Sequence, residues 1–260
     1  MSTKETDANI YIASGHVDSG SIAALLRAHS TQVVVGHPTY HNEETIGALV
    51  ARDLARAAEP GTRRTTVIVC DGTWRADAPD MNVLDAAESA ARVTFSNLTD
   101  TSNIQFIAVT CDGYDGDRTP GKGSALKLVF AEAAAGDVET VVLADGDLRN
   151  DMGNWRDVYE KLHADHLVKH PGQPYFVTAR YARHFVDASL TRFIVGPLTT
   201  LLGTYVPGGI SGDIAVSAEV LQLEAGANWT EARRKYGTDI STTLDNIAAG
   251  TKIYEVYLGA

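Results

Sequence analysis

The sequence predicts an α/β fold in which a mostly parallel, Rossmann-like sheet carries helices on both faces. Strand-like and helix-like segments alternate through the first half of the chain at intervals of about 35 residues, with short loops between them. The strand-like runs are continuously apolar and β-branched, which is typical of buried parallel strands. Three of the four runs also end in an aspartate, where a parallel sheet binds its ligands.

The elements of the first half follow this alternation in order. We expect strands over residues 32–38, 65–72, 104–113 and 139–147, and helices over residues 42–58, 83–98 and 123–135. In the first helix, apolar residues recur at helical spacing, and Asn42 is a favourable N-cap. This half, residues 31–150, is predicted to carry a ligand site at its strand ends, and residues 1–30 are predicted to form a helical extension in front of it.

The second half, residues 151–260, is less regular. We expect helices over residues 154–170, 190–205 and 237–250, strands over 174–184 and 252–259, and a glycine-rich turn before a strand or helix over 206–221. This half is predicted to complete the same domain. Its apolar character favours a homodimer.

Composition excludes several classes of function. The 260 residues carry a formal net charge of −11, and no Lys/Arg cluster forms a basic face, so a nucleic-acid partner is not expected. Cys70 and Cys111 each end a strand-like run, which indicates buried thiols rather than a disulfide. No secretory signal and no span of roughly 20 apolar residues is visible, so we expect a soluble, cytoplasmic protein without a membrane partner.

Aspartates follow three predicted strands: Asp71, Asp112, and the pair Asp145 and Asp147 that flanks Gly146. Any one of them is an ordinary turn or cap residue, but three along one edge of a sheet indicate a ligand site. Two carboxylates separated by one glycine suit a hard divalent cation that also binds phosphate oxygens. The segment "TVVLADGDLRN" therefore predicts a Mg²⁺ or Mn²⁺ site.

A lysine loop lies upstream of this pair. Pro120 and Gly121 form a tight turn, Lys122 follows, and a helix begins near Gly123. Loop amides and a helix N-terminus beside a lysine suit anionic oxygens. The loop has neither Walker A nor GxGxxG spacing, which disfavours P-loop and Rossmann dinucleotide enzymes.

Together these motifs resemble the GT-A glycosyltransferases, in the order "HPTYHNEETI", "VIVCDGT", "PGKGSAL" and "LADGDL". The likeness is strongest to the retaining enzymes that make glucosyl-3-phosphoglycerate and to mannosylglycerate synthases, through "GGISGDIAVS", "KYGTDIS" and "KIYEVYLG", and it spans residues 33–260. Those enzymes complete the metal site with a histidine after the last strand. No histidine follows Tyr254 here, so none is assigned.

The resemblance implies that residues 31–150 bind the nucleotide sugar and that residues 151–260 bind the acceptor. It also implies the roles of the donor-site residues. Pro38, Tyr40, Glu43, Glu44 and Asp71 would line the base and ribose, Gly121 and Lys122 the diphosphate, Asp145 the ribose and metal, and Asp147 the metal. Asp213 matches the position of a glutamate close to the sugar, and Asp239 matches an acidic residue at a helix start; both are candidate catalytic residues.

Cations for an anionic acceptor lie between the metal motif and the glycine-rich turn. Arg180, Arg183 and Arg192 suit bidentate recognition of a carboxylate or phosphate, and Ser211 lies in the turn. The alternative is that each arginine is solvated or forms ion pairs with neighbouring carboxylates and binds no ligand.

The expected function is a metal-dependent, retaining transfer of a hexose. The donor would be a nucleoside diphosphate sugar of the UDP-glucose or GDP-mannose type, and the acceptor glycerate or 3-phosphoglycerate. A sugar-1-phosphate nucleotidyltransferase and a non-catalytic sugar-nucleotide-binding protein remain as alternatives. The first would carry a glycine-rich loop directly after the first strand, where this sequence reads "GHPTYHNEET".

Overall fold

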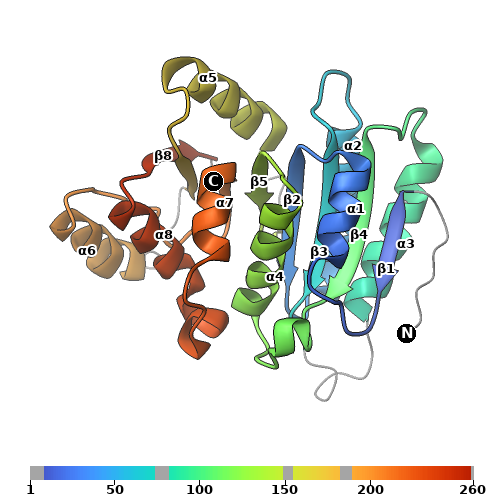
Figure 1. Ribbon diagram of the computed structural model, residues 1–260, viewed down its shortest axis with the longest axis horizontal. Coiled ribbons are helices and arrows are strands. Elements are labelled where there is room, and N and C mark those ends of the chain that lie inside the picture. Colours follow the sequence, from blue (N-terminus) through green and yellow to red (C-terminus); the bar gives the residue numbers. More distant parts are fainter. Residues whose placement is uncertain (1–8, 74–81, 149–154, 182–188, 259–260) are drawn as a thin grey trace.

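In the computed structural model, which describes residues 9–73, 82–148, 155–181 and 189–258, one eight-stranded sheet runs through the chain (Figure 1). The strands are β1 (Ile10–Ala13), β2 (Val33–Thr39), β3 (Thr65–Asp71), β4 (Ile104–Thr110), β5 (Thr140–Leu143), β6 (Tyr175–Arg180), β7 (Ile214–Ser217) and β8 (Lys252–Tyr257). Their order is β1-β4-β3-β2-β5-β7-β6-β8. Within the described residues only β7 runs antiparallel to its neighbours, so the prediction of a mostly parallel α/β sheet is confirmed.

The helices alternate with the strands as predicted. They are α1 (Ser21–His29), α2 (Glu43–Ala57), α3 (Asn82–Asn97), α4 (Lys122–Ala135), α5 (Lys161–Lys169), α6 (Gly196–Leu201), α7 (Ala218–Ala225) and α8 (Thr238–Ala248). Four short helical segments join them: η1 (Tyr114–Gly116), η2 (Arg156–Glu160), η3 (Thr191–Val195) and η4 (Arg233–Gly237). None of the helices in these ranges is long and apolar enough to cross a membrane.

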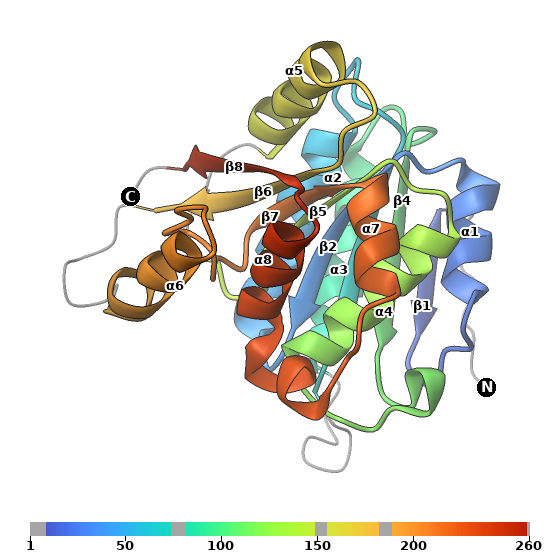
Figure 2. The ribbon, with the colours of Figure 1, turned by 60° about the vertical axis from the view of Figure 1, so that its left-hand side comes forward.

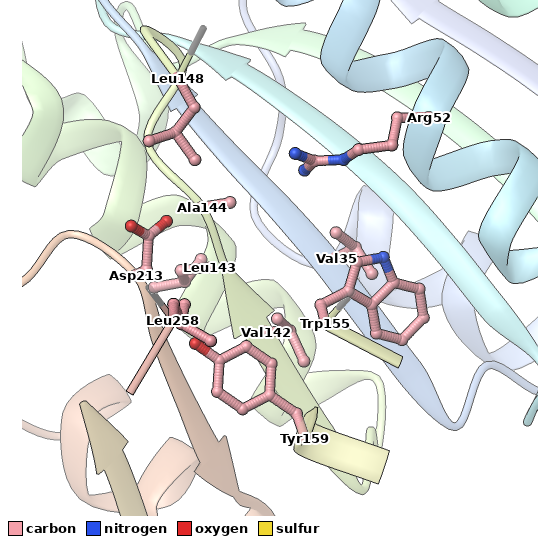
Figure 3. Close-up of a pocket in the computed structure, with 10 residues that line it drawn as sticks. All are labelled: Val35, Arg52, Val142, Leu143, Ala144, Leu148, Trp155, Tyr159, Asp213 and Leu258. Carbon is pink, nitrogen blue, oxygen red and sulfur yellow. The ribbon is translucent and has the colours of Figure 1, made fainter. Parts of the chain in front are cut away.

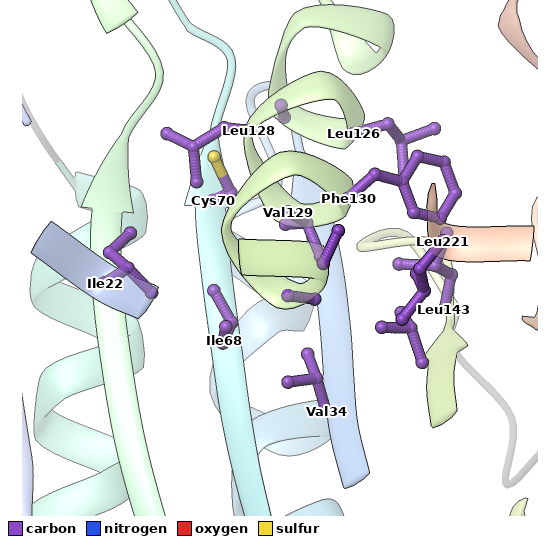
Figure 4. Packing of buried hydrophobic residues seen from close by; sticks show 14 of the residues in the cluster. Ile22, Val34, Ile68, Cys70, Leu126, Leu128, Val129, Phe130, Leu143 and Leu221 are labelled. Atoms are coloured by element: carbon purple, nitrogen blue, oxygen red, sulfur yellow. The ribbon is translucent and has the colours of Figure 1, made fainter. Parts of the chain in front are cut away.

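Each face of the sheet has its own apolar core. On one face, α1, α4 and α7 pack over the strands through residues such as Ile22, Phe130 and Leu221 (Figures 2 and 4). On the other face, α2 and α3 pack through Ile46 and Leu84. The fully buried side chains of β2 to β5 supply both cores, which explains why their sequences are apolar without alternation. Helices on both faces are therefore confirmed.

The N-terminal segment differs from the helical extension expected over residues 1–30. Residues 21–29 form α1, but Ile10–Ala13 form β1, which pairs in parallel with β4 at the edge of the sheet. The reason is local: Ile10 and Ile12 enter one core while Ala13 enters the other, so this short run alternates between faces as a strand does. At four residues, β1 is too short to stand out in the sequence.

The sheet continues without a break from the first half of the chain into the second. Strand β7 pairs with β5 on one side and β6 on the other, so residues 214–217 lie beside residues 140–143. The two predicted halves, 31–150 and 151–260, thus share one sheet. The glycine-rich turn before β7 consequently lies next to the Asp145–Asp147 turn after β5.

Cys70 and Cys111 are both free and buried, in agreement with the sequence analysis. Burial raises the pKa of the Cys70 thiol, which neighbours Cys111. We therefore regard both as packing residues of the core that contains α4.

Candidate active site

The lysine loop is attached to the carboxyl ends of β2 and β3 through glycine backbone. The Gly72 N–H donates to the Thr39 carbonyl at 2.8 Å, and the Gly121 N–H donates to the Gly72 carbonyl at 3.1 Å. A Cβ atom on Gly72 would lie 2.6 Å from the Gly121 carbonyl oxygen, so only glycine permits this approach. These contacts place Lys122 at the carboxyl edge of the sheet.

Lys122 lies between two of the predicted carboxylates. Its Nζ is 2.7 Å from Asp145 Oδ1 and 3.2 Å from Asp239 Oδ1. Burial lowers the pKa of Lys122, but the two negative charges outweigh it and hold the pKa above its ordinary value. The structure therefore brings together a first-turn residue of α4, a residue that follows β5 and a first-turn residue of α8.

Asp213, just before β7, completes this cluster. It is 5% exposed, and its Oδ1 accepts a hydrogen bond of 3.3 Å from the Asp145 backbone N–H. The Tyr181 hydroxyl donates to Oδ2. Burial and the nearby charge of Asp145 raise the pKa of Asp213 to about 6. Because Asp239 is also desolvated, burial raises its pKa although Lys122 opposes the shift.

Sequence reasoning missed two residues that shape this cluster, Tyr181 and Gly212. A Cβ atom on Gly212 would lie 1.8 Å from Asp145 Oδ2, so a side chain there would displace the carboxylate. The signal for Gly212 was its place in the glycine-rich turn. The signal for Tyr181 was its position directly after β6, at the same sheet edge as the end of β5.

The turn after β5 presents the second carboxylate of the pair. Gly146 packs so tightly that a Cβ atom would lie 2.8 Å from Thr39 Cγ2, and its carbonyl accepts a hydrogen bond from the Thr45 hydroxyl. Asp147, the next residue, is exposed. No group of three or more His, Cys, Asp or Glu side chains that could hold a metal occurs in the described ranges. Two carboxylates are nevertheless a sufficient protein share for Mg²⁺, which commonly takes its other ligands from phosphates and water.

The predicted base and ribose residues lie along the ends of β2 and β3. Asp71 is buried and accepts hydrogen bonds from the Thr73 N–H at 3.1 Å and the Thr39 hydroxyl at 3.3 Å. Burial raises the pKa of Asp71, although the bonds to Thr73 oppose the shift. Pro38 lies in β2 beside Cys70. Outside the strands, Tyr40 is 47% exposed, and Glu43 and Glu44 are exposed in the first turn of α2. Asp112 follows β4, which β3 and β2 separate from β5.

A buried charge cluster behind the turn was also missed. His37 is fully buried; its Nε2 is 2.8 Å from Asp53 Oδ2, and its Nδ1 is 3.2 Å from the carbonyl oxygen of Ala144. Arg52 donates to the other Asp53 oxygen at 2.7 Å. Burial raises the pKa of Asp53, but His37 and Arg52 outweigh it and lower the pKa. Through the contact between His37 and the Ala144 carbonyl, this cluster holds in place the residue that precedes Asp145.

A small cavity joins the two clusters. Figure 3 shows the Asp213 carboxylate and the Arg52 guanidinium on opposite sides of it, with the rings of Tyr159 and Trp155 below them in this view. Val35, Val142, Leu143, Ala144, Leu148 and Leu258 complete its lining. The apolar lining explains why Asp213 loses its hydration.

A second pocket lies beside Asp213 and contains three of the four predicted acceptor residues. Arg180, Arg192 and Ser211 line it together with Tyr181 and Tyr205, and Ala179, Thr191, Pro207, Gly208 and Ile210 complete the lining. The fourth, Arg183, lies outside the described residues. Two bonds of 2.7 Å shape the pocket: the Gly208 N–H donates to Glu255 Oε1, and the Thr178 hydroxyl donates to the Gly208 carbonyl.

Comparison with solved structures identifies the fold. The chain is similar to glucosyl-3-phosphoglycerate synthase from Mycobacterium tuberculosis in complex with Mn²⁺, UDP and phosphoglyceric acid, with a TM-score of 0.60 and 20% identity over 97% of this chain and 76% of that one. It is similar to the same enzyme with Mg²⁺ and UDP (TM-score 0.59, 19% identity, 97% and 77% coverage). A third structure of that enzyme, with Mn²⁺ and UDP-glucose, gives TM-score 0.58, 20% identity and 97% and 77% coverage. No protein-family model matches the chain, and no curated protein matches it significantly. The resemblance to a GT-A fold is thus confirmed.

Proposed function

We propose that the chain is a metal-dependent glycosyltransferase that moves a hexose from a nucleoside diphosphate sugar to a small anionic acceptor. One observation carries the proposal: Lys122 lies between Asp145 and Asp239, with Asp213 bonded to the Asp145 backbone, at the carboxyl edge of a GT-A sheet. Structures with this fold hold UDP with Mn²⁺ or Mg²⁺. The lysine suits the phosphates of such a ligand, and the excess carboxylates around it suit the divalent metal that the ligand brings.

The residues fit a hexose donor as follows. Asp145 and Asp147 would hold Mg²⁺ or Mn²⁺, which supplies charge neutralisation for the departing diphosphate. Lys122 would bind the same phosphates, and Gly121, whose N–H donates to the Gly72 carbonyl, would hold the lysine loop beside them. Asp71, Pro38, Tyr40, Glu43 and Glu44 would line the base and ribose.

Retention of the anomeric configuration is our proposal for the stereochemistry, by a front-face reaction that the leaving group assists. Asp213 is buried and bonded to Tyr181, so it is better placed to orient the sugar than to attack it as a nucleophile. Asp239 would hold Lys122 and the wall of the site. Arg180, Arg192 and Ser211 would bind the carboxylate or phosphate of glycerate or 3-phosphoglycerate, with Arg183 as a further candidate. We also propose a cytoplasmic homodimer.

Product analysis tests this proposal. Purified protein is incubated with UDP-glucose or GDP-mannose, each with glycerate or 3-phosphoglycerate, with Mn²⁺ or with EDTA, and the products are separated by chromatography. We expect one pair to yield a glycoside and free nucleoside diphosphate only with metal. The same preparations receive a nucleoside triphosphate and a sugar 1-phosphate; release of inorganic diphosphate there would instead indicate nucleotidyl transfer.

A further inference from the structure

We propose that Arg233 is a positioning residue of the proposed diphosphate site. Its side chain fixes the backbone of η4, and η4 in turn holds the lysine loop in place. This inference rests on the proposed function, because the site it supports is the Lys122 cluster. Arg233 is 5% exposed and lies in none of the sequence motifs described above. Its effect would therefore pass through other residues rather than through contact with a ligand.

The side chain of Arg233 ties three elements together. Its Nη2 donates to the buried carboxylate of Glu224 in α7, and its Nη1 donates to Asp245 in α8 at 2.6 Å. The guanidinium carbon lies 4.5 Å from the ring centroid of Trp229, within cation–π range. Asn246 adds a hydrogen bond of 3.3 Å to Glu224. Because the planar guanidinium of Arg233 binds two carboxylates and lies over an aromatic ring, it holds η4 in one orientation.

The backbone of η4 forms the support for the lysine loop. A Cβ atom on Gly123 would lie 2.4 Å from the Arg233 carbonyl oxygen and 2.5 Å from that of Arg234. Gly121, at φ 132°, approaches the Arg234 carbonyl in the same way, with a Cβ distance of 3.2 Å. Arg234 also pairs with Asp117 at 3.0 Å, just before the loop. The glycines on both sides of Lys122 therefore pack directly on η4.

The same segment sets the position of the opposite carboxylate. Helix α8 begins at Thr238, immediately after η4, and its first turn carries Asp239. Both ends of the ion pair between Lys122 and Asp239 are thus fixed by η4. If Arg233 is removed, Glu224 becomes a buried carboxylate without its cation, and η4 is expected to move to hydrate it. A small displacement of η4 would then misplace both Lys122 and Asp239, the two groups that are proposed to face the diphosphate.

Arg63 offers a matched control at the other end of the sheet. It is largely buried and also lies between two carboxylates, with Nη1 3.1 Å from Glu139 and Nη2 2.7 Å from Glu160. It precedes β3, whereas the Lys122 cluster lies beyond the ends of β3 and β5. Loss of Arg63 should therefore destabilise the fold without moving the lysine loop.

The experiment compares Arg233→Met and Arg63→Met with the wild-type chain. Calorimetry measures the Kd for UDP and GDP with Mn²⁺, and hydrogen exchange of the ligand-free protein follows residues 117–126. We expect Arg233→Met to raise the Kd at least about tenfold, which corresponds to 1.4 kcal/mol, and to speed exchange in this segment. Arg63→Met should do neither, although both variants melt earlier. Arg233→Lys, which keeps the charge but loses the fork, should fall between wild type and Arg233→Met.

Each outcome decides the proposal. An unchanged Kd and unchanged exchange in folded Arg233→Met would overturn it, as would equal effects of Arg63→Met. If Arg233→Met does not fold, Arg233→Lys is judged by the same two measurements. If wild type binds neither nucleotide, the proposed function fails, and exchange alone then decides whether Arg233 positions the lysine loop.

Discussion

The two ends of the sheet each hold a cation between two carboxylates. At the amino end Arg63 pairs with Glu139 and Glu160, and at the carboxyl end Lys122 pairs with Asp145 and Asp239. The side chains of the two cations are similarly shielded, with 16% and 25% exposed. Ion pairing and burial alone therefore do not distinguish a structural cluster from a ligand site.

The distinction lies in what surrounds each pair. Arg63 also donates to Thr140 at 3.2 Å and lies 3.1 Å from His163, so polar groups of its own fold surround its guanidinium. The Lys122 cluster instead adjoins a further buried carboxylate, Asp213, whose pKa is raised to about 6, and the exposed Asp147. An excess of desolvated negative charge is costly for the fold alone, and a divalent metal, which would in turn hold a diphosphate, would relieve it.

The comparison is tested most strongly by removing each cation. Lys122→Met should lower kcat/KM for the sugar donor on the order of 10²- to 10³-fold, because a positioned charge on the leaving group is lost. Arg63→Met should leave kcat/KM unchanged and lower only the melting temperature. Steady-state kinetics of folded variants give both values. Equal losses in the two variants would show that the clusters do not differ as described.

Backbone space at the carboxyl edge predicts the next largest effect. Gly212→Ala would place a Cβ atom against the Asp145 carboxylate, so we expect kcat/KM to fall about 100-fold through misplacement of the site. Gly15→Ala is the control, because a Cβ atom there meets nothing within 4 Å. The two variants are compared by kinetics after circular dichroism confirms folding. Wild-type kinetics in Gly212→Ala would contradict the close packing of Gly212 on Asp145.

The proposed acceptor pocket should respond separately from the proposed donor site. Arg192→Met is expected to raise the acceptor KM about tenfold and leave the donor KM unchanged, because it removes a cation from the pocket beside Asp213. Arg92→Met, which removes the pair with Glu88 in α3, away from the pocket, serves as the control. Initial rates with each substrate varied in turn measure both constants. A change confined to the donor KM would place Arg192 in the other subsite.

The smallest effect concerns pH at the amino end. Burial and the charge of Arg63 lower the pKa of His163 below its ordinary value of 6.5. As pH falls through 6.5, the unfolded chain takes up this proton before the folded chain does, so the free energy of unfolding falls until the folded pKa is reached. His163→Gln should flatten this part of the curve, as measured by urea unfolding between pH 7.5 and pH 5. An identical slope in the variant would show that His163 does not contribute.

Sequence patterns predicted the parts of the molecule that are determined by residues close together in the chain. The four central strands, their following helices and the motif residues Lys122 and Asp145 follow from periodicity and from the rule that ligands bind at carboxyl ends of strands, whereas Asp213 was expected only from the family resemblance. Strand β1, the pairing of β7 with β5, and the support of the lysine loop by η4 depend on contacts between distant segments. His37 and Asp53 were missed for the same reason, because their bond joins a strand to a helix 16 residues later.

Titration of nucleotides tests the central claim most directly. UDP and GDP are titrated calorimetrically into wild-type protein and Asp147→Ala, each with and without Mn²⁺. The arrangement of Lys122, Asp145 and Asp147 predicts that one nucleotide binds wild type tightly only with Mn²⁺ and that Asp147→Ala loses this gain. Nucleotide binding that ignores both the metal and the Asp147→Ala substitution would contradict the assignment of this edge of the sheet as the donor site.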